Sequence, residues 1–308
     1  MPSSQHIIDQ VIKLWKLKPS LRFVRKVENW IYHSAEDKLY IRLTDPLHRS
    51  AEEINAELTW LEYLQAQGVQ FAHPVPSIDG TLLKTIDHKD QIFFVSVFRE
   101  ASGRPLKDPA DFTSTVCKSW GSILGQLHVA TKNYQHPSAK IRSSWDTDKI
   151  HLEILERINL EGGAISSEAK RLIKLFQNLP KEKDDFGLIH ADLHRGNFHV
   201  DENEQVVAFD FDDALHHWFV YDIAVVFYSL EKNEFYQSWN EFAQYFWDGY
   251  ESHKKIDAKW RALVPEFVKY RGVFLYYWYK KNLKNTTFSE VSKNWMLEKI
   301  KKFEEKFT

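Results

Sequence analysis

Residues 188–197 read Leu-Ile-His-Ala-Asp-Leu-His-Arg-Gly-Asn, and residues 207–213 read Val-Ala-Phe-Asp-Phe-Asp-Asp. Each stretch begins with apolar, strand-forming residues and ends in polar ones, which predicts two short strands that present polar side chains on the loops after them. Asp192, Asn197 and Asp210 supply two carboxylates and an amide oxygen. Such oxygens bind hard divalent cations, and Mg²⁺ fits when phosphate oxygens complete its coordination. The sequence therefore predicts a Mg²⁺ site beside a phosphate-bearing ligand.

The spacing His190-x-Asp192-x-x-x-x-Asn197 is that of the catalytic loop of kinases. Asp210-Phe211 follows where the metal-binding Asp-Phe-Gly of a kinase would lie. A three-position pattern alone is weak, but its place between short strands and downstream of a β-rich segment strengthens the kinase interpretation.

Upstream of this motif the chain is rich in β-forming residues. Apolar periodicity predicts a helix at 3–18 and another at 49–67, which Gly68 would end. The expected strands are two β-rich runs at 22–33 and 38–43, which flank a polar turn, and two short strands at 81–86 and 91–98. The first hundred residues are thus expected to form a small sheet with one prominent helix.

Helical periodicity dominates the rest of the chain. Gly103 and Pro105 mark a connection, and the predicted helices that follow include 112–131, 149–159 and 167–179, with several more after Asp222. We therefore expect an α+β protein with two lobes, residues 1–100 and 101–308, and a site at their junction.

The composition excludes several classes of protein. The 308 residues include 41 Lys and Arg against 43 Asp and Glu, so no basic footprint for nucleic acid is expected. No apolar run approaches the roughly 18 residues of a membrane span. The single cysteine, Cys117, cannot form an internal disulfide, and residues 1–10 lack the features of a signal peptide, so a cytoplasmic protein is expected.

The sequence resembles the aminoglycoside phosphotransferases and their choline, homoserine and methylthioribose kinase relatives. The resemblance is carried by residues 190–198 as the catalytic loop and by 209–214 with 221–224 as its continuation, and more loosely by 38–43, 57–61 and 120–128. It implies a protein-kinase-like fold in which a β-rich N-terminal lobe binds the nucleotide and a helical C-terminal lobe holds the catalytic loop and the acceptor.

The resemblance also implies roles for individual residues. Asp192 would orient or deprotonate the acceptor hydroxyl, while Asn197 and Asp210 would hold Mg²⁺ against ATP. The residues implied in nucleotide binding are Arg42 on the α- and β-phosphates with Glu57 as its partner, Asn29 in a hairpin over the phosphates, and Phe98 and Glu100 in the hinge at 97–101. The expected acceptor is a small polar hydroxyl compound. A cationic amino alcohol or aminoglycoside is favoured, because Asp212, Asp213 and several aromatic residues would face it.

Three positions depart from the family pattern. Ala191 stands where the catalytic loop has glycine, a change expected to cost little, and Arg42 stands where many relatives have lysine. The hairpin at 27–31 has no glycine, which argues against a protein kinase. Glu52 and Glu53 compete with Glu57 as the partner of Arg42.

Other interpretations remain open at this point. His190 and His194 are four residues apart, as in half of a zinc motif, but a structural role for His190 in the loop is favoured. Asp222 is expected to bind loop backbone. Aromatic residues at 245–250 and 276–279 are expected in the core, although they would also suit an amine-binding box. An inactive nucleotide-binding scaffold and a metal-dependent hydrolase are the competing functions.

Overall fold

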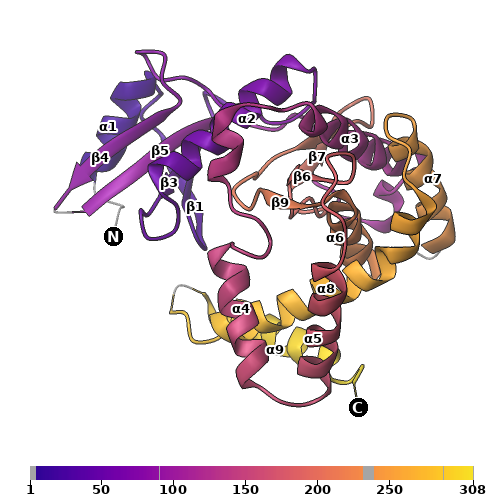
Figure 1. Ribbon diagram of the computed structural model, residues 1–308. Helices are drawn as coiled ribbons and strands as arrows, with labels where there is room; N and C mark the ends of the chain where they lie inside the picture. The colour runs from indigo at the N-terminus through magenta and orange to yellow at the C-terminus, as the bar shows by residue number, and fades with distance from the viewer. Residues whose placement is uncertain (1–4, 90, 232–238, 287, 308) are drawn as a thin grey trace.

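The computed structural model describes residues 5–89, 91–231, 239–286 and 288–307 (Figure 1). Its N-terminal part is an antiparallel sheet of five strands in the order β1-β2-β3-β5-β4. The strands are β1 (Leu21–Lys26), β2 (Trp30–Ser34), β3 (Leu39–Thr44), β4 (Leu83–His88) and β5 (Gln91–Arg99). The β-rich run predicted at 22–33 is therefore two strands, because the chain turns back at residues 27–29 to pair Lys26 with Trp30.

One face of the sheet is covered by α1 (Gln5–Trp15) (Figure 1). Its apolar stripe of Ile7, Val11 and Trp15 is buried in the same cluster as the central strands, among them Ile41 on β3. The periodicity of 3.6 residues in this segment predicted that stripe, and burial of such side chains stabilises the sheet. The predicted start of the helix at residue 3 lies outside the described residues.

Helix α2 (Ala51–Ala66) follows β3 and lies between the sheet and the C-terminal part. Ser50 and Glu53 form a capping box at its start, which satisfies the first free backbone amides of the helix. Trp60 is fully buried and contacts the ring of Phe211 at 5.7 Å between centroids. This helix thereby fixes the sheet to the segment that carries the catalytic motif.

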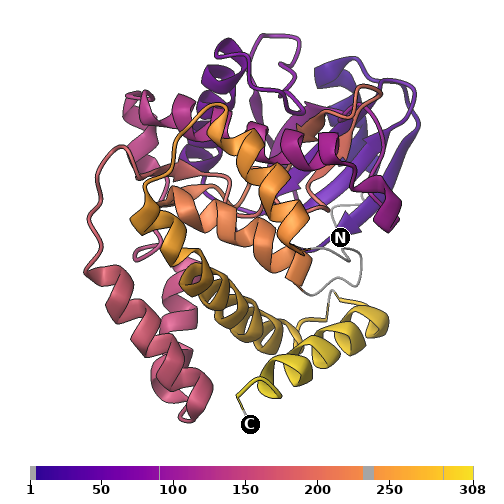
Figure 2. The same cartoon turned by 90° about the vertical axis from the view of Figure 1, so that its right-hand side faces the viewer.

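The C-terminal part is mainly helical (Figure 2). Its helices are α3 (Ser114–Lys132), α4 (Lys149–Leu160), α5 (Ala164–Gln177), α6 (Phe219–Glu231), α7 (Trp239–Glu251), α8 (Ala258–Asn282) and α9 (Glu290–Glu304). Short 3₁₀ turns lie at Pro109–Asp111 (η1) and Pro137–Ile141 (η2). Two small antiparallel sheets interrupt the helices and are formed by β6 (Phe186–Ile189) with β9 (Leu215–Trp218) and by β7 (Phe198–Val200) with β8 (Val206–Ala208). A sheet-bearing N-terminal part and a helical C-terminal part confirm the predicted α+β class.

Three helices begin at other residues than the sequence predicted, and the first of them, α2, begins at Ala51 in place of residue 49 because Ser50 is its cap. Helix α3 begins at Ser114 because the Thr113 hydroxyl accepts a hydrogen bond from the backbone amide of Val116. Helix α5 begins at Ala164, directly after Gly163, whose φ of 95° ends the preceding loop. The division of the lobes at residue 100 stays a prediction, and β5 ends one residue before it.

Most of the C-terminal aromatic residues lie in the core, as predicted. Tyr250 and Tyr277 are almost completely buried, whereas Trp278 and Tyr279 line a cavity described below. Across the described residues, no helix combines the length and hydropathy that a membrane span requires.

Candidate active site

The loop after β6 is held by a single carboxylate. The backbone amides of His190 and Ala191 donate to the two oxygens of Asp222 at 3.0 and 2.7 Å. Asp222 is fully buried in α6 and also contacts Nε2 of His128 at 3.2 Å. Two hydrogen bonds from one rigid helix fix the path of the loop, so the predicted role of Asp222 in binding loop backbone is confirmed.

Ala191 adopts a left-handed backbone conformation with φ of 66°. A β-carbon in this region is strained by about 1–2 kcal/mol, and glycine avoids that strain. The expectation that alanine would cost little at this position is therefore wrong. The strain is tolerated because the hydrogen bonds to Asp222 determine the conformation of the loop.

The imidazole of His190 has a structural role, as favoured from the sequence. It is fully buried, its Nε2 contacts the carbonyl oxygen of Phe209 at 3.1 Å, and its Nδ1 accepts from the backbone amide of Asp192 at 3.3 Å. Both ring nitrogens are thus used within the loop. A zinc-binding role would require one of them to be free.

Asp192 lies at the centre of the loop with both carboxylate oxygens engaged. Its Oδ1 forms an ion pair with Arg271 of α8, and its Oδ2 accepts from Nδ2 of Asn197 at 3.0 Å and lies 3.5 Å from Nε2 of His194. Arg271 is 79 residues away in the sequence, and no sequence motif marks it. Asp192 and Arg271 line the same cavity, described below, and these contacts orient the Asp192 carboxylate towards it.

The electrostatic environment keeps Asp192 ionised. Burial raises the pKa of this carboxyl group, but the neighbouring His194 imidazole and Arg271 guanidinium outweigh burial and hold the pKa well below its usual range. An ionised carboxylate can accept a hydrogen bond from a hydroxyl group across the neutral pH range.

We expect Arg271→Gln to move the acidic limb of the pH profile of kcat/KM to higher pH. Removal of the positive charge raises the pKa of Asp192, and the group must be ionised to act on a hydroxyl. The control is Lys269→Gln, which removes an exposed cation of the same helix that pairs with Glu266. Coincident acidic limbs in the wild type and both variants would contradict this assignment.

Asn197 and Asp210 suit a divalent cation. The Asn197 amide nitrogen donates to Asp192, so its carbonyl oxygen is the atom that remains for a cation. Asp210 already binds a positive group, since its Oδ2 lies 2.9 Å from a guanidinium nitrogen of Arg25. Burial raises the pKa of Asp210, and Arg25 offsets this only in part, so a second cation would stabilise the ionised Asp210 carboxylate. The donor set therefore fits Mg²⁺.

Arg42 and Glu57 form the predicted pair. The two terminal nitrogens of the Arg42 guanidinium, Nη1 and Nη2, donate to the Glu57 carboxylate at 2.9 and 2.8 Å. Arg42 lies on β3 and Glu57 on α2, and both side chains are buried. Glu53 is used in the capping box of α2, which excludes it as the partner. The pair lines a cavity of about 270 Å³ between the sheet and residues 209–211, which follow β8, and this is the candidate nucleotide cavity.

The other predicted nucleotide residues lie in different places. Phe98 lines the nucleotide cavity, with its ring 4.9 Å from the Arg42 guanidinium. The Glu100 carboxylate lies 3.3 Å from Nε2 of His33, and the Glu100 backbone amide donates to the carbonyl oxygen of Lys38. Glu100 does not line the nucleotide cavity. Asn29 is buried and donates to Asp212 at 3.0 Å, and it lines the neighbouring cavity. Nucleotide contacts by Asn29 and Glu100 stay predictions.

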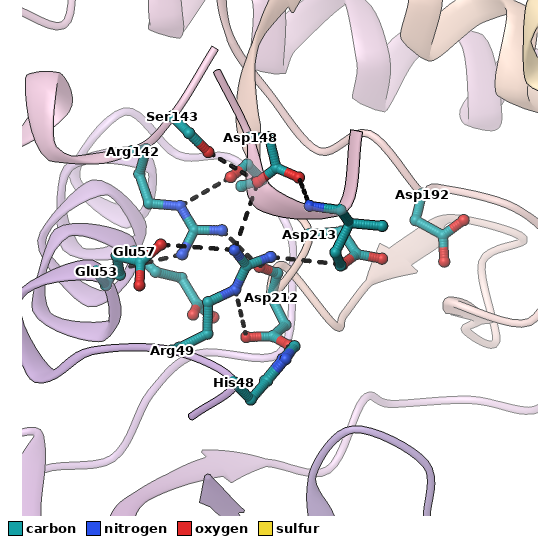
Figure 3. A network of polar contacts seen from close by, with 12 residues as sticks. His48, Arg49, Glu53, Glu57, Arg142, Ser143, Asp148, Asp192, Asp212 and Asp213 are labelled. Atoms are coloured by element: carbon teal, nitrogen blue, oxygen red, sulfur yellow. Dashed lines mark hydrogen bonds and ion pairs between the residues drawn. The ribbon is translucent and has the colours of Figure 1, made fainter. Parts of the chain in front are cut away.

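A buried network of charges lies beside the site (Figure 3). Its centre is Asp212, which accepts from His48 at 2.7 Å and lies 3.8 Å from Arg42 and 3.9 Å from Arg49. Asp212 is buried with cations as neighbours, but it also lines the larger cavity described below, so its contact with an acceptor amine stays a prediction. Positive neighbours hold its pKa well below the usual range despite burial, which acts in the opposite direction.

Two further residues connect this network to the helical part. Arg142 donates to the carbonyl oxygens of Ala214 and Asp212, and Asp148 at the start of α4 lies 3.6 Å from Arg49. Arg49 comes from the N-terminal part and Arg142 from the segment before α4, so the network joins the two parts of the chain (Figure 3).

A second, larger cavity of about 680 Å³ adjoins the nucleotide cavity and is lined by Asp192. Asp213, His194 and Arg271 line its polar side, and side chains of α8 and α9 line its apolar side, among them Phe274, Trp278, Trp295 and Met296. We call it the acceptor cavity. It is amphipathic, with the catalytic loop at its polar end.

Comparison with known proteins assigns the family. The sequence matches the model of the Phosphotransferase enzyme family over residues 22–263. The chain belongs to the phosphotransferase enzyme family. This phosphotransferase is 30% identical over 273 residues to the amicoumacin kinase of Bacillus subtilis, an alignment that covers 84% of this chain and 79% of the relative.

Solved structures agree with this assignment. An amicoumacin kinase in complex with AMP-PNP, Ca²⁺ and Ami superposes with a TM-score of 0.84 at 26% identity, covering 99% of this chain and 94% of that one. A microcompartment-associated aminopropanol kinase has the same fold, with a TM-score of 0.76 at 23% identity over 97% of this chain and 95% of that one. The predicted family, the protein-kinase-like fold and the class of ATP-dependent phosphotransferases acting on alcohol groups are confirmed.

Proposed function

We propose that this phosphotransferase transfers the γ-phosphoryl group of ATP to a hydroxyl group of a small amphipathic acceptor, with amicoumacin as the first candidate. The observation that carries the proposal is that Asp192, Asn197 and Asp210 all line the acceptor cavity, and that Asp210 also lines the nucleotide cavity. The relationship to an amicoumacin kinase at 30% identity supports this acceptor.

The residues of the site have separate tasks in this reaction. Asp192, oriented by Arg271 and Asn197, accepts the hydrogen bond of the acceptor hydroxyl and takes its proton as the new O–P bond forms. The bond between the γ-phosphorus and the bridging oxygen breaks, and ADP leaves with that electron pair. Arg42, fixed by Glu57, binds the non-transferred phosphates. Mg²⁺, held by Asn197 and Asp210, neutralises phosphate charge when bound.

The acceptor cavity suggests where each part of the acceptor binds. The aromatic and aliphatic side chains of α8 and α9 suit a flat apolar body, and the hydroxyl end must reach Asp192. An ammonium group is expected beside Asp213, whose side chain is 41% exposed, and away from the cation Arg271. A cationic acceptor therefore remains favoured. Asp213 is its expected anionic partner, because Asp212 lines the same cavity but is buried beside Arg42 and Arg49.

The competing functions have less support. The scaffold interpretation requires a degraded site, yet all three predicted catalytic and metal residues lie together. For a hydrolase, the described residues offer one group of possible metal ligands, Glu28, His48 and Asp212, and this group adjoins the cations Arg42 and Arg49, which disfavour a metal ion. The single cysteine of the chain cannot form an internal disulfide, and the cytoplasm remains our proposed location.

Two measurements test the function. We expect ATP with Mg²⁺ to raise the melting temperature more than ATP alone, because a ligand that binds the folded state stabilises it by mass action. We also expect ADP release on addition of amicoumacin, compared with choline, homoserine, an aminoglycoside and an anionic sugar phosphate. Stabilisation by ATP without turnover of any hydroxyl compound would favour the scaffold, and turnover without ATP would favour the hydrolase.

A further inference from the structure

The nucleotide cavity and the acceptor cavity share one short stretch of wall. Four residues line both cavities, namely Arg25, Ile31, Gly196 and Asp210. A phosphoryl group that passes from a nucleotide in one cavity to a hydroxyl group in the other must cross this shared wall. Arg25 is the only cation among these four residues.

An irregularity in β1 directs Arg25 to this place. In the β1–β2 ladder Phe23 pairs with Tyr32 and Arg25 pairs with Ile31, so Val24 is an extra residue, a β-bulge. Without the bulge, alternation along the strand would place Arg25 on the same face as Phe23. With it, Arg25 lies opposite Ile31 on the face of the cavities, and Val24 lines the nucleotide cavity as well.

The ion pair of Arg25 with Asp210 can be replaced by an ion pair of Asp210 with a divalent cation. The guanidinium lies 2.9 Å from Oδ2 of Asp210, and the two side chains are 55% and 31% exposed. A solvent-exposed pair of this kind contributes little to stability, so a divalent cation can replace the guanidinium at Asp210 at small cost. Released from Asp210, Arg25 would remain at the shared wall, where phosphate oxygens are the available anions.

We propose that Arg25 is a catalytic residue that exchanges partners: it occupies Asp210 in the nucleotide-free enzyme and contacts the oxygens of the transferring phosphoryl group once ATP and a divalent cation are bound. Arg25 gains and loses no proton and forms no covalent bond in this step. Its positive charge stabilises the negative charge on the phosphoryl oxygens in the transition state. This role rests on the kinase function proposed above.

The test compares Arg25→Gln with Arg22→Gln, which removes an exposed cation of the same strand that lines neither cavity. We expect Arg25→Gln to lower kcat by roughly 10- to 100-fold, the effect of one charge-assisted hydrogen bond, with the KM for ATP near the wild-type value. Arg25→Lys should restore part of kcat, because it keeps the charge without the planar guanidinium. Turnover is measured as ADP release with amicoumacin and, in parallel, with water as the acceptor.

A second measurement requires no turnover. Mn²⁺ binding to the nucleotide-free protein, followed by electron paramagnetic resonance, should be several-fold tighter in Arg25→Gln than in the wild type, because the competing guanidinium is gone. Arg22→Gln should bind Mn²⁺ as the wild type does. Loss of Mn²⁺ binding in Asp210→Asn would confirm that the ion occupies this site.

The outcomes separate this inference from the kinase function itself. A wild-type kcat in Arg25→Gln, or unchanged Mn²⁺ affinity in the nucleotide-free protein, would overturn the exchange of partners while the kinase assignment stands. If the wild type neither binds nor turns over ATP, the proposed function fails. The Mn²⁺ measurement still tests the inference in that case, because unchanged Mn²⁺ affinity in Arg25→Gln would show that Arg25 does not compete with a cation for Asp210.

Discussion

Replacement of Asp192 by Asn is expected to lower kcat by roughly 10²- to 10⁴-fold, the usual contribution of a positioned acid or base. The affinity for ATP should stay near the wild-type value, because Asp192 faces the acceptor cavity and is absent from the lining of the nucleotide cavity. The asparagine side chain keeps the size of the aspartate but cannot take the hydroxyl proton. Single-turnover kinetics, with ATP binding measured by calorimetry, separate the two effects.

Asp210→Asn is the matched comparison for this prediction. It should lower the rate and also raise the Mg²⁺ concentration needed for half-maximal activity, since it removes a carboxylate from the proposed metal site. The melting temperature of both variants is measured, because Asp192→Asn also leaves the buried Arg271 without its partner. Equal, mild effects of both substitutions would show that the catalytic loop has been misassigned.

Asp212→Asn is expected to lower the free energy of unfolding by about 3–5 kcal/mol, with a fall in melting temperature on the order of 10 °C. Asp212 is buried and is the shared anionic neighbour of His48, Arg42 and Arg49. Removal of its charge takes the hydrogen-bonded anion from His48 and leaves Arg42 with Glu57 and Arg49 with Asp148 and Asp213 as remaining anionic neighbours. A neutral amide of the same size cannot replace the lost charge. Thermal and urea unfolding, followed by circular dichroism, measure the effect.

The adjacent Asp213 is the control for Asp212. Its side chain is 41% exposed and lies 3.7 Å from Arg49, so Asp213→Asn should change the free energy of unfolding by less than about 1 kcal/mol. Asp213→Asn should instead raise the KM for a cationic acceptor. A similar loss of stability in both variants would show that the negative charges of the segment act together and that Asp212 has no special role.

Much of the fold and part of the site could be predicted from the sequence alone. Local periodicity was sufficient for α1, α2 and most strands of the N-terminal sheet, because each element needs only the pattern of its own residues, but it did not show the turn that divides the run at 22–33. The motif placed Asp192, Asn197 and Asp210, and family register identified Glu57 as the partner of Arg42. These predictions succeeded where spacing along the chain determines the chemistry.

The remaining features of the site depend on contacts between distant segments. Arg271 reaches Asp192 across 79 residues, and Arg25 reaches Asp210 across 185 residues through a bulge that no local pattern marks. Asp212 was assigned to the acceptor because it is an acidic residue of the lobe that was expected to enclose the acceptor. Its burial is a property of the packing of Arg42 and Arg49 around it, which the sequence does not display.

The separation of the two cavities has a consequence for how the range of acceptors can change. The apolar wall formed by Phe274, Trp278, Trp295 and Met296 belongs to the acceptor cavity and contributes nothing to the lining of the nucleotide cavity. These side chains come from the last two helices, whereas the buried charges around Asp212 come from earlier segments. Acceptor specificity can therefore be changed by mutations in the C-terminal fifty residues while the phosphate donor is retained.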